Sequence, residues 1–172
     1  MIYPAELNKN KNQTMLIMAM EKLTAANPHI HLLLPGQDSM NGFHSKLIKE
    51  KGLQNNIHLL GYRADIPQLL MVSDLSVSAS YREGLPVHIM EAMTAGLPVV
   101  ATKCRGASEL VKNHENGYVV KISNVHDFAS EVKKIIHDEE RRKKMAKNSK
   151  RRSANYKLAT INTILAKIYE ER

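Results

Sequence analysis

The sequence predicts an α/β fold in which one parallel sheet carries helices on both faces. Three observations predict it. Short apolar runs alternate along the chain with segments of helical spacing, as in strands joined by crossover helices. Glycine and proline stand between these segments, as at Pro35-Gly36 and Gly96-Leu97-Pro98. With 172 residues, 43% of them hydrophobic and 24% charged, the chain has the size and composition of one globular domain.

In the first half of the chain, apolar residues at helical spacing predict a helix over 14–23, and a polar segment that ends at glycine predicts another over 39–52. Apolar runs closed by glycine or proline predict buried strands over 29–34 and 56–60. Residues 1–3 resemble the end of a further strand with no element before it. We therefore expect a piece of a longer protein.

The second half continues the alternation, with helices expected over 66–72, 86–95 and 108–112 and strands over 74–80, 98–102 and 117–120. Pro86 suits the first position of its helix, where the missing N–H costs nothing, and Gly96 suits the position just past the end. Two or three helices finish the chain. We expect one Rossmann-like domain over residues 1–172, with residues 139–172 as a basic helical extension.

Cysteine and histidine usage narrows the class of protein. A single cysteine, Cys104, excludes an internal disulfide and fits a reducing compartment. The eight histidines show no metal-ligand spacing with it, so we expect no metal site. No apolar run has the length of a membrane span, and no signal peptide opens the chain. These features predict a cytoplasmic protein.

The net charge of +8 is concentrated at the C-terminal end. Residues 132–172 hold 13 Lys and Arg against 5 Asp and Glu, whereas the first 131 residues hold 12 of each. A solvated helix face, an anionic membrane surface, nucleic acid or an acidic partner domain would each suit such a segment. Because aromatic residues make up only 5% and tryptophan is absent, we expect no nucleic acid partner. Peripheral contact with the inner face of the cell membrane is our hypothesis.

The stretch YREGLPVHIMEA, residues 81–92, places Glu83 and Glu91 around the start of a helix. They could be two solvated acids on a surface. A helix start, however, offers unpaired N–H groups to phosphate, and Gly84 would let the backbone fold over the same anion. Carboxylates bind vicinal hydroxyl groups, and Glu91 lies roughly 7 Å along the helix. The spacing suggests a nucleotide-sugar, with ribose at Glu91, phosphates at the helix start and sugar at Glu83.

The segment EGLP…EAM…GLPVVAT, residues 83–102, resembles the donor-site signature of the family-4 retaining glycosyltransferases, which have the two-Rossmann-domain (GT-B) architecture. Further matches follow the order of that family: the lysine-bearing loop 8–13, the loop 59–66, and the segments 107–111 and 116–120. The resemblance runs to about residue 150, and it covers only the C-terminal, donor-binding domain of the family.

The resemblance implies roles for individual residues. Lys11 would contact the diphosphate and Glu83 the hydroxyl groups of the transferred sugar, and these two form the expected catalytic pair. Glu91 would bind the ribose. The remaining donor-binding residues would be Gly84, Leu85 and Pro86 near the sugar and phosphate, and Gly36, Gly61, Tyr62 and Arg63 around the nucleotide. Alternatively, Lys11 could be only a polar residue at the start of a helix, and Gly36 and Gly61 could be only turn residues. No cofactor is implied, and we expect a UDP-sugar as donor.

One position departs from the family pattern. Glu6 stands where the family often carries an arginine that neutralises the diphosphate. Either Lys9 or Arg82 compensates, or the phosphate subsite differs, and the acid should point away from the phosphate. We expect His88, within the motif, to pack or face solvent, and Cys104 beside Arg105 to be incidental.

The resemblance implies transfer of a hexosyl residue, with retention, to a glycan or lipid-linked acceptor. The acceptor-binding domain would precede this chain, so the chain alone is expected to lack turnover. Two alternatives remain. A nucleotide-sugar epimerase shares the architecture but lacks the lysine loop and glutamate pair as found here. The other is a non-catalytic interaction module with a basic, membrane-facing tail.

Overall fold

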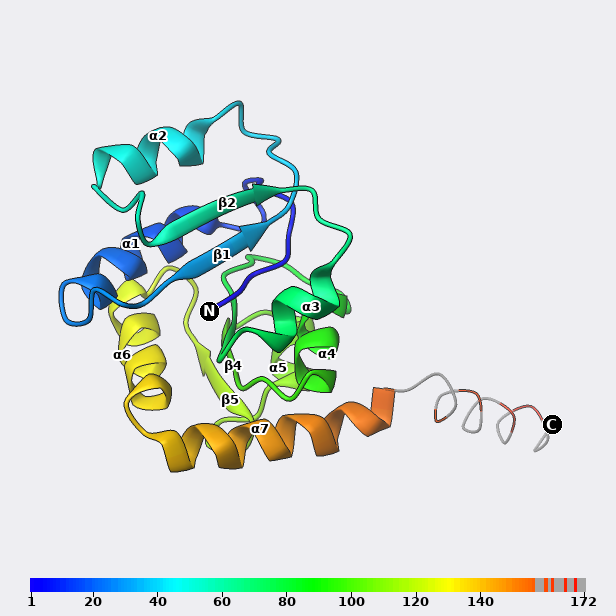
Figure 1. The fold of residues 1–172 in the computed structure, drawn as a ribbon. Helices are drawn as coiled ribbons and strands as arrows, with labels where there is room; N and C mark the ends of the chain where they lie inside the picture. The colour runs from blue at the N-terminus through cyan, green and yellow to red at the C-terminus, as the bar shows by residue number, and fades with distance from the viewer. Residues whose placement is uncertain (157–159, 161, 163–165, 167–168, 170–172) are drawn as a thin grey trace.

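The computed structural model describes residues 1–156 and, beyond them, residues 160, 162, 166 and 169. Strands and helices alternate as predicted (Figure 1). The strands are β1 (Leu32–Pro35), β2 (Ile57–Gly61), β3 (Ser76–Ser78), β4 (Val99–Thr102) and β5 (Gly117–Val120). The helices are α1 (Gln13–Thr24), α2 (Phe43–Glu50), α3 (Ile66–Met71), α4 (Val87–Thr94), α5 (Arg105–Leu110), α6 (Val125–Ile136) and α7 (Glu139–Ser153), followed by the 3₁₀ turn η1 (Ala154–Tyr156).

All strand pairs are parallel, and the first residues of the chain join them into one sheet. β1 pairs with β2, and β4 lies between β3 and β5. Ile2 forms parallel bridges to Leu33 of β1 and to Ser76 of β3. Its N–H donates to the carbonyl oxygen of Leu75 (3.0 Å), and the Val77 N–H donates to the Ile2 carbonyl (2.9 Å). The order across the sheet is therefore β2, β1, the segment around Ile2, β3, β4, β5, and the expectation that residues 1–3 belong to the sheet is confirmed.

Helices cover both faces of this sheet, as the predicted α/β fold requires. The strand β4 shows it most clearly, because it is buried along its whole length and alternate residues face opposite sides. Val100 packs into a core shared with α1 and α6, whereas Val99 and Ala101 pack against α4 and α5. Figure 1 shows the same layers, with α1 and α6 on one side of the strands and α3, α4 and α5 on the other.

No helix in the described part of the chain combines the length and apolar character needed to cross a bilayer.

Two predicted helices have different bounds in the structure. The helix expected from residue 39 begins only at Phe43, because the Asp38 carboxylate accepts the N–H groups of Met40 and Gly42 (both 2.7 Å) and closes a turn there. Gly42 has a φ of 77° in this turn, which a helix cannot continue. The helix expected over 108–112 instead spans Arg105–Leu110, and the extended backbone of Val111 (ψ 124°) ends it.

Pro86 does not occupy the first position of α4, so that expectation is wrong by one residue. Its ψ of 91° is extended, and its carbonyl oxygen accepts the N–H groups of Ile89 (3.0 Å) and Met90 (3.3 Å), as an N-cap residue does. As expected, Gly96 lies just past the end of the helix, and its φ of 82° is left-handed. The proline ring thus sets the direction of the chain just before the helix.

Gly117 provides a test of the sheet register. A Cβ atom at this position would lie 1.8 Å from the carbonyl oxygen of Val99, a main-chain atom that cannot move aside. We expect Gly117→Ala to lower the free energy of unfolding by about 3 kcal/mol, measured by urea denaturation with circular dichroism. Gly84→Ala is the matched control, because no atom lies within 4 Å of its Cβ position, and it should shift stability by less than about 0.5 kcal/mol. Equal midpoints for the two variants would contradict the β4–β5 pairing.

Candidate functional site

Two loops meet at the carboxyl edge of the sheet, although they are far apart in sequence. One precedes α1, and the other follows β3. The side-chain amide of Asn10 donates to the carbonyl oxygen of Arg82 (3.0 Å), 72 positions away, and the Tyr81 N–H donates to the Asn10 carbonyl (2.9 Å). The Asn12 amide donates to the carbonyl oxygen of Ala79 (3.3 Å). These bonds place both loops beside each other at the edge where parallel sheets bind ligands.

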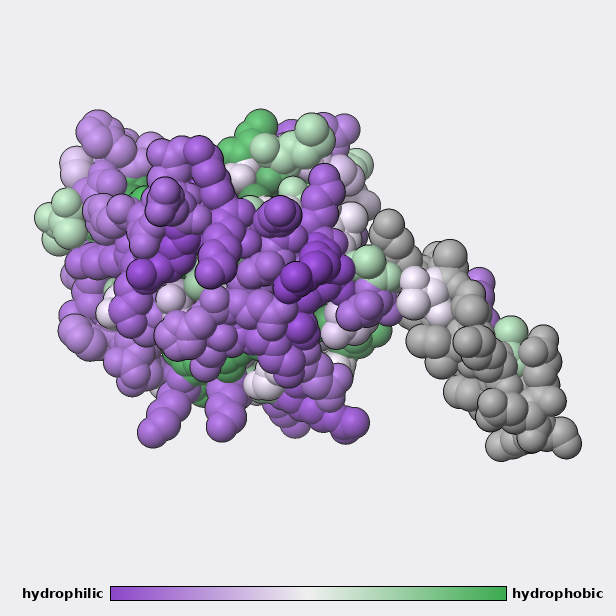
Figure 2. All heavy atoms as spheres, turned by 90° about the horizontal axis from the view of Figure 1, so that it is seen from below, coloured by the Kyte–Doolittle hydropathy of each residue, from purple (hydrophilic) through white to green (hydrophobic). Residues whose placement is uncertain are grey.

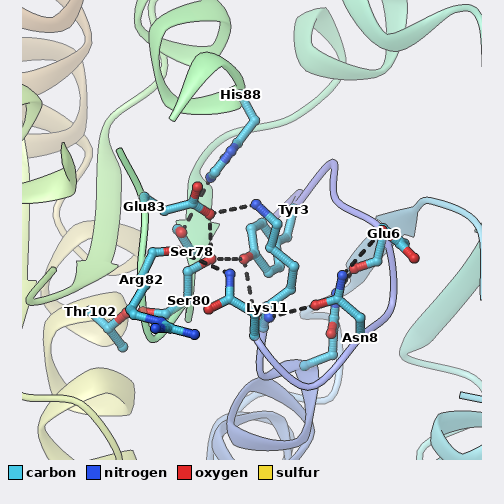
Figure 3. Close-up of polar contacts among 12 residues, drawn as sticks. Tyr3, Glu6, Asn8, Lys11, Ser78, Ser80, Arg82, Glu83, His88 and Thr102 are labelled. Carbon is cyan, nitrogen blue, oxygen red and sulfur yellow. Dashed lines mark hydrogen bonds and ion pairs between the residues drawn. The ribbon is translucent and has the colours of Figure 1, made fainter. Parts of the chain in front are cut away.

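An ion pair joins the loops at the centre of this edge (Figure 3). The Lys11 ammonium nitrogen lies 2.5 Å from Oε1 of Glu83, and the two side chains are only 21% and 12% exposed. The Ser80 hydroxyl donates to the same carboxylate oxygen (2.6 Å). The structure thus brings together the two residues that the sequence predicted as a catalytic pair.

Burial and hydrogen bonding fix the charge states around this pair. Burial raises the pKa of the Glu83 carboxyl, but the hydrogen bonds from Lys11 and Ser80 and the Lys11 charge outweigh it and hold that pKa below its ordinary value. Burial lowers the pKa of His88 to about 4, against the attraction of Glu83. Glu83 is therefore a carboxylate and His88 a neutral imidazole near neutral pH.

His88 packs inside the molecule, as the sequence suggested. It is 8% exposed, and its Nε2 lies 3.2 Å from the Ser78 hydroxyl. The edge of its ring faces the ring of Tyr3, with 5.3 Å between the centroids. Figure 3 shows the imidazole directed toward Glu83 from the first turn of α4. His88 thus belongs to the inner wall of the site.

The start of α5 holds the Glu83–Gly84 backbone from the other side. The Gly106 N–H donates to the carbonyl oxygen of Glu83 (3.1 Å). A Cβ atom on Gly106 would lie 2.4 Å from the carbonyl oxygen of Gly84 and 2.6 Å from Cδ of Pro86. Only glycine therefore permits this approach. Sequence reasoning assigned no role to Gly106, although a glycine in the loop between the predicted strand 98–102 and the predicted helix 108–112 was a signal for close approach of the backbone.

A cavity of about 370 Å³ gathers three of the four residues predicted to surround a nucleotide, whereas the fourth, Gly61, is not among the residues that line it. Gly36, Tyr62 and Arg63 line it together with the loop of residues 4–6. The Gly36 N–H donates to the carbonyl oxygen of Gly61 (2.8 Å), and a Cβ on Gly36 would lie 1.9 Å from the Ala5 carbonyl oxygen. Close backbone packing therefore shapes this cavity.

Glu6 also lines this cavity, and its carboxylate is held by its own loops. Ser39 donates to one carboxylate oxygen and the Asn8 amide to the other (3.2 Å). In Figure 3 Glu6 lies on the opposite side of Lys11 from Glu83. Lys9 and Arg82 are exposed, and within the described residues neither cation forms an ion pair with a carboxylate.

Glu91 lies away from the Lys11–Glu83 pair and lines another cavity. It is exposed on α4 and lines a largely apolar cavity of about 500 Å³ between α3 and α4. Ile66, at the start of α3, lines both this cavity and the one at Gly36, so the two hollows adjoin there. Leu85 is 59% exposed on the loop before α4. The two glutamates therefore flank the start of α4 without a shared contact.

Across the part of the chain that the structure describes, no three His, Cys, Asp or Glu side chains cluster so as to hold a metal ion. Cys104 is buried at the start of α5. The chemistry available at the edge of the sheet is therefore that of a lysine cation, a carboxylate, hydroxyl groups and backbone N–H groups.

Comparison with known proteins identifies the family. The family model described as glycosyl transferases, group 1, matches residues 1–152. The glycosyltransferase EpsD of Bacillus subtilis is 32% identical over 98% of this chain, which corresponds to 44% of its own length. An α-1,3-N-acetylgalactosaminyltransferase of Campylobacter jejuni, named for its N,N'-diacetylbacillosaminyl-diphospho-undecaprenol acceptor, is 33% identical over 66% of the chain and 30% of its own. The chain thus spans less than half the length of these relatives.

Solved structures share the fold. HepE of Anabaena, crystallised with UDP, superposes with a TM-score of 0.90 at 30% identity, covering 99% of this chain and 49% of HepE. The C-terminal domain of the group 1 protein LpcC from Francisella tularensis superposes with a TM-score of 0.82 at 26% identity, covering 91% of this chain and 85% of that domain. This chain therefore corresponds to one domain of such proteins.

Acid should destabilise the protein through His88. The pKa of about 4 in the folded state lies below the ordinary 6.5 of an unfolded chain, so the unfolded state binds more protons between these values. The contribution of neutral His88 to the free energy of unfolding is fully present above about pH 6.5. It falls by up to about 3 kcal/mol as the pH is lowered toward 4. His88→Gln keeps a polar group for Ser78 and should flatten this dependence in urea denaturation between pH 4 and 7. His29→Gln, at an exposed histidine, should keep the wild-type slope, and equal slopes for all three proteins would contradict the assignment.

Proposed function

This chain belongs to the group 1 glycosyl transferases, and on that premise we propose that it forms the donor-binding half of a retaining hexosyltransferase. The observation that carries the proposal is the pairing of Lys11 with Glu83 where two loops meet at the carboxyl edge of the sheet. The pair puts a cation and a hydrogen-bond acceptor side by side, which suits a ligand made of a phosphate and a sugar.

In this proposal Lys11 and Glu83 contact different parts of the donor. The Lys11 ammonium and the backbone N–H groups at the start of α4 stabilise the diphosphate as it leaves. The Glu83 carboxylate accepts hydrogen bonds from hydroxyl groups of the sugar, and its lowered pKa keeps it charged for that role. The anomeric carbon loses its bond to the diphosphate oxygen and gains a bond to the acceptor oxygen on the same face, and the proton of the acceptor hydroxyl passes to the departing diphosphate.

The nucleotide occupies the neighbouring hollows in the same proposal. The cavity lined by Gly36, Tyr62 and Arg63 takes the base, and Glu91 binds the ribose hydroxyl groups. Gly84, Leu85 and Pro86 approach the sugar and phosphates through their backbone. The name of the HepE structure, which contains UDP, supports a uridine nucleotide. The adjoining of the two hollows at Ile66 allows one ligand to reach both.

The acceptor and the complete reaction belong to the whole protein. The chain matches only 44% of EpsD and 49% of HepE, so we propose that a preceding domain supplies the second wall of the cleft. A glycan or a lipid-linked sugar is the proposed acceptor, supported by relatives whose names include a diphospho-undecaprenol. An epimerase is the weaker alternative, because EpsD, the Campylobacter jejuni relative and a relative from Streptomyces kanamyceticus are named as transferases.

Substitution of the two glutamates tests the donor assignment. We expect Glu91→Gln to weaken the binding of UDP and of UDP-glucose alike, by about tenfold, because the ribose is common to both. Glu83→Ala should weaken only UDP-glucose, by a similar factor, because it faces the sugar. Isothermal titration calorimetry on the 172-residue chain measures both ligands.

The control for this test is Glu50→Gln, an exposed acid on α2 whose substitution should leave both affinities unchanged. If the wild-type chain binds neither UDP nor UDP-glucose, that result contradicts the donor-site proposal and favours an interaction module. Weakened UDP binding in Glu83→Ala would contradict the separate placement of sugar and nucleotide.

We also propose that α7 contacts an anionic membrane surface. Its outward side carries five exposed cations, Lys143, Lys144, Lys147, Lys150 and Arg151, while Met145 and Ser149 are buried against the domain. Figure 2 looks onto the side of the molecule where α7 lies and shows an almost continuous hydrophilic surface. A row of cations on a helix attracts anionic lipids. The end of the predicted basic extension, residues 157–159, 161, 163–165, 167–168 and 170–172, lies outside the described residues.

The three lysines of α7 without an ion pair among the described residues test this contact. We expect the triple variant Lys144→Gln, Lys147→Gln, Lys150→Gln to bind vesicles of phosphatidylglycerol and phosphatidylcholine at least about tenfold more weakly in co-sedimentation, and wild-type binding to fall with added salt. The control replaces exposed Lys22, Lys46 and Lys49 of α1 and α2 by Gln, with equal loss of net charge. Equal weakening by both triple variants, or salt-independent binding, would argue against α7 as the contact.

A further inference from the structure

We propose that Ser80 and Tyr3 are positioning residues that hold the Glu83 carboxylate through a buried relay of hydroxyl groups, so that one of its oxygens stays directed toward the sugar. The inference rests on the proposed function, because it assigns Glu83 to the sugar of the donor. It concerns residues that do not touch the ligand themselves. Ser80 follows β3, and Tyr3 lies between β1 and β3 beside Ile2.

The directions of the hydrogen bonds follow from counting protons. Ser80 has one hydroxyl proton, and its oxygen lies 2.6 Å from Oε1 of Glu83, which can only accept when ionised. The Tyr3 hydroxyl lies 2.6 Å from the Ser80 oxygen. Since the Ser80 proton is directed to the carboxylate, Tyr3 must be the donor in that second bond. Burial raises the pKa of the Tyr3 phenol well above its ordinary value, so the phenol keeps its proton.

The relay is anchored at both ends by the protein interior. Tyr3 and Ser80 are both fully buried, with 0% exposure. The Thr102 hydroxyl on β4 donates to the main-chain carbonyl of Ser80 (2.6 Å) and fixes its backbone. The Tyr3 hydroxyl also lies 3.3 Å from the Lys11 carbonyl oxygen, but its one proton is directed to the nearer Ser80 oxygen. Figure 3 shows these side chains converging below Glu83.

The arrangement leaves one side of the carboxylate for a ligand. Lys11 and Ser80 both donate to Oε1, and within the described residues Oε2 receives no hydrogen bond. A diphosphate competes with the Glu83 carboxylate for the Lys11 ammonium, because both anions are attracted to the same positive charge. Ser80 is neutral and buried, so it keeps its bond to Glu83 when the lysine turns to phosphate. The relay therefore preserves the orientation of Glu83 when the ion pair is shared.

The same strand supplies a matched control. Ser76 and Ser78 on β3 and Ser80 just after it alternate along the chain and are all buried, but the hydroxyl of Ser76 has no hydrogen-bond partner among the described residues. Ser76→Ala removes an equally buried hydroxyl from the same strand, without touching Glu83. Comparing it with Ser80→Ala separates loss of the relay from loss of a buried serine.

The first measurement follows Glu83 itself, without any ligand. We expect ¹³C carboxyl NMR of the 172-residue chain to show the Glu83 pKa rising by about one unit in Ser80→Ala and by less in Tyr3→Phe, with no change in Ser76→Ala. An unchanged Glu83 pKa in Ser80→Ala would overturn the relay. This result does not depend on whether the chain binds a donor.

The second measurement links the relay to the sugar. In calorimetry, Ser80→Ala should weaken UDP-glucose by about tenfold and Tyr3→Phe by about threefold, while UDP itself binds as to wild type. In a Glu83→Gln background, Ser80→Ala should add no further loss, because both act on one contact. A loss of UDP affinity that equals the loss for UDP-glucose would show general damage to the site and overturn the positioning role. If the wild-type chain binds neither ligand, the proposed function fails, and the carboxyl titration alone decides whether the relay exists.

Discussion

The backbone hydrogen bonds of residues 1–3 are the constraint on which the rest of the structure depends. Met1 and Tyr3 bond to Leu33 of β1, whereas Ile2 bonds to Leu75 and Val77 on the β3 side, so this segment makes one sheet from two sets of strands. The same segment sets the position of Tyr3 and, a few residues later, of the loop that carries Lys11. Because Glu83 follows β3, the bonds of residues 1–3 bring a lysine and a glutamate 72 positions apart to within 2.5 Å. The order of the strands therefore brings the two loops of the candidate site together.

Charge at the site is balanced by groups that differ in how firmly they are held. Glu83 is mostly buried, and a buried carboxylate is costly unless donors surround it. Lys11 supplies a charged donor on a mobile stem, and Ser80 supplies a neutral donor inside the core. His88, kept neutral by burial, adds no cation that would compete with Lys11. The result is a single cation beside a single fixed anion.

Much of this could be predicted from sequence, for physical reasons. Apolar runs between glycines identified the strands, and the placement of the site at the start of α4, from the spacing of Glu83 and Glu91, stays a prediction. The bounds of α2 and α5 were not predictable, because an Asp38 side chain that closes a turn and the extended backbone of Val111 decide them. Long-range contacts were equally hidden: no local pattern pairs Tyr3 with Ser80, although serines alternating in a buried strand were an unread signal for polar contacts.

The loop that carries Glu83 is held mainly through main-chain atoms. Asn10 bonds to the carbonyl oxygen of Arg82, and Gly106 bonds to that of Glu83, so neither contact depends on the side chain at those positions. Leu85, on the same loop, is exposed. Such a loop can exchange its outward side chains without changing its path. In the proposed function, selectivity for one sugar over another can therefore diverge among descendants of this domain by substitution alone, with no insertion, no deletion and no rebuilding of the loop that carries the glutamate.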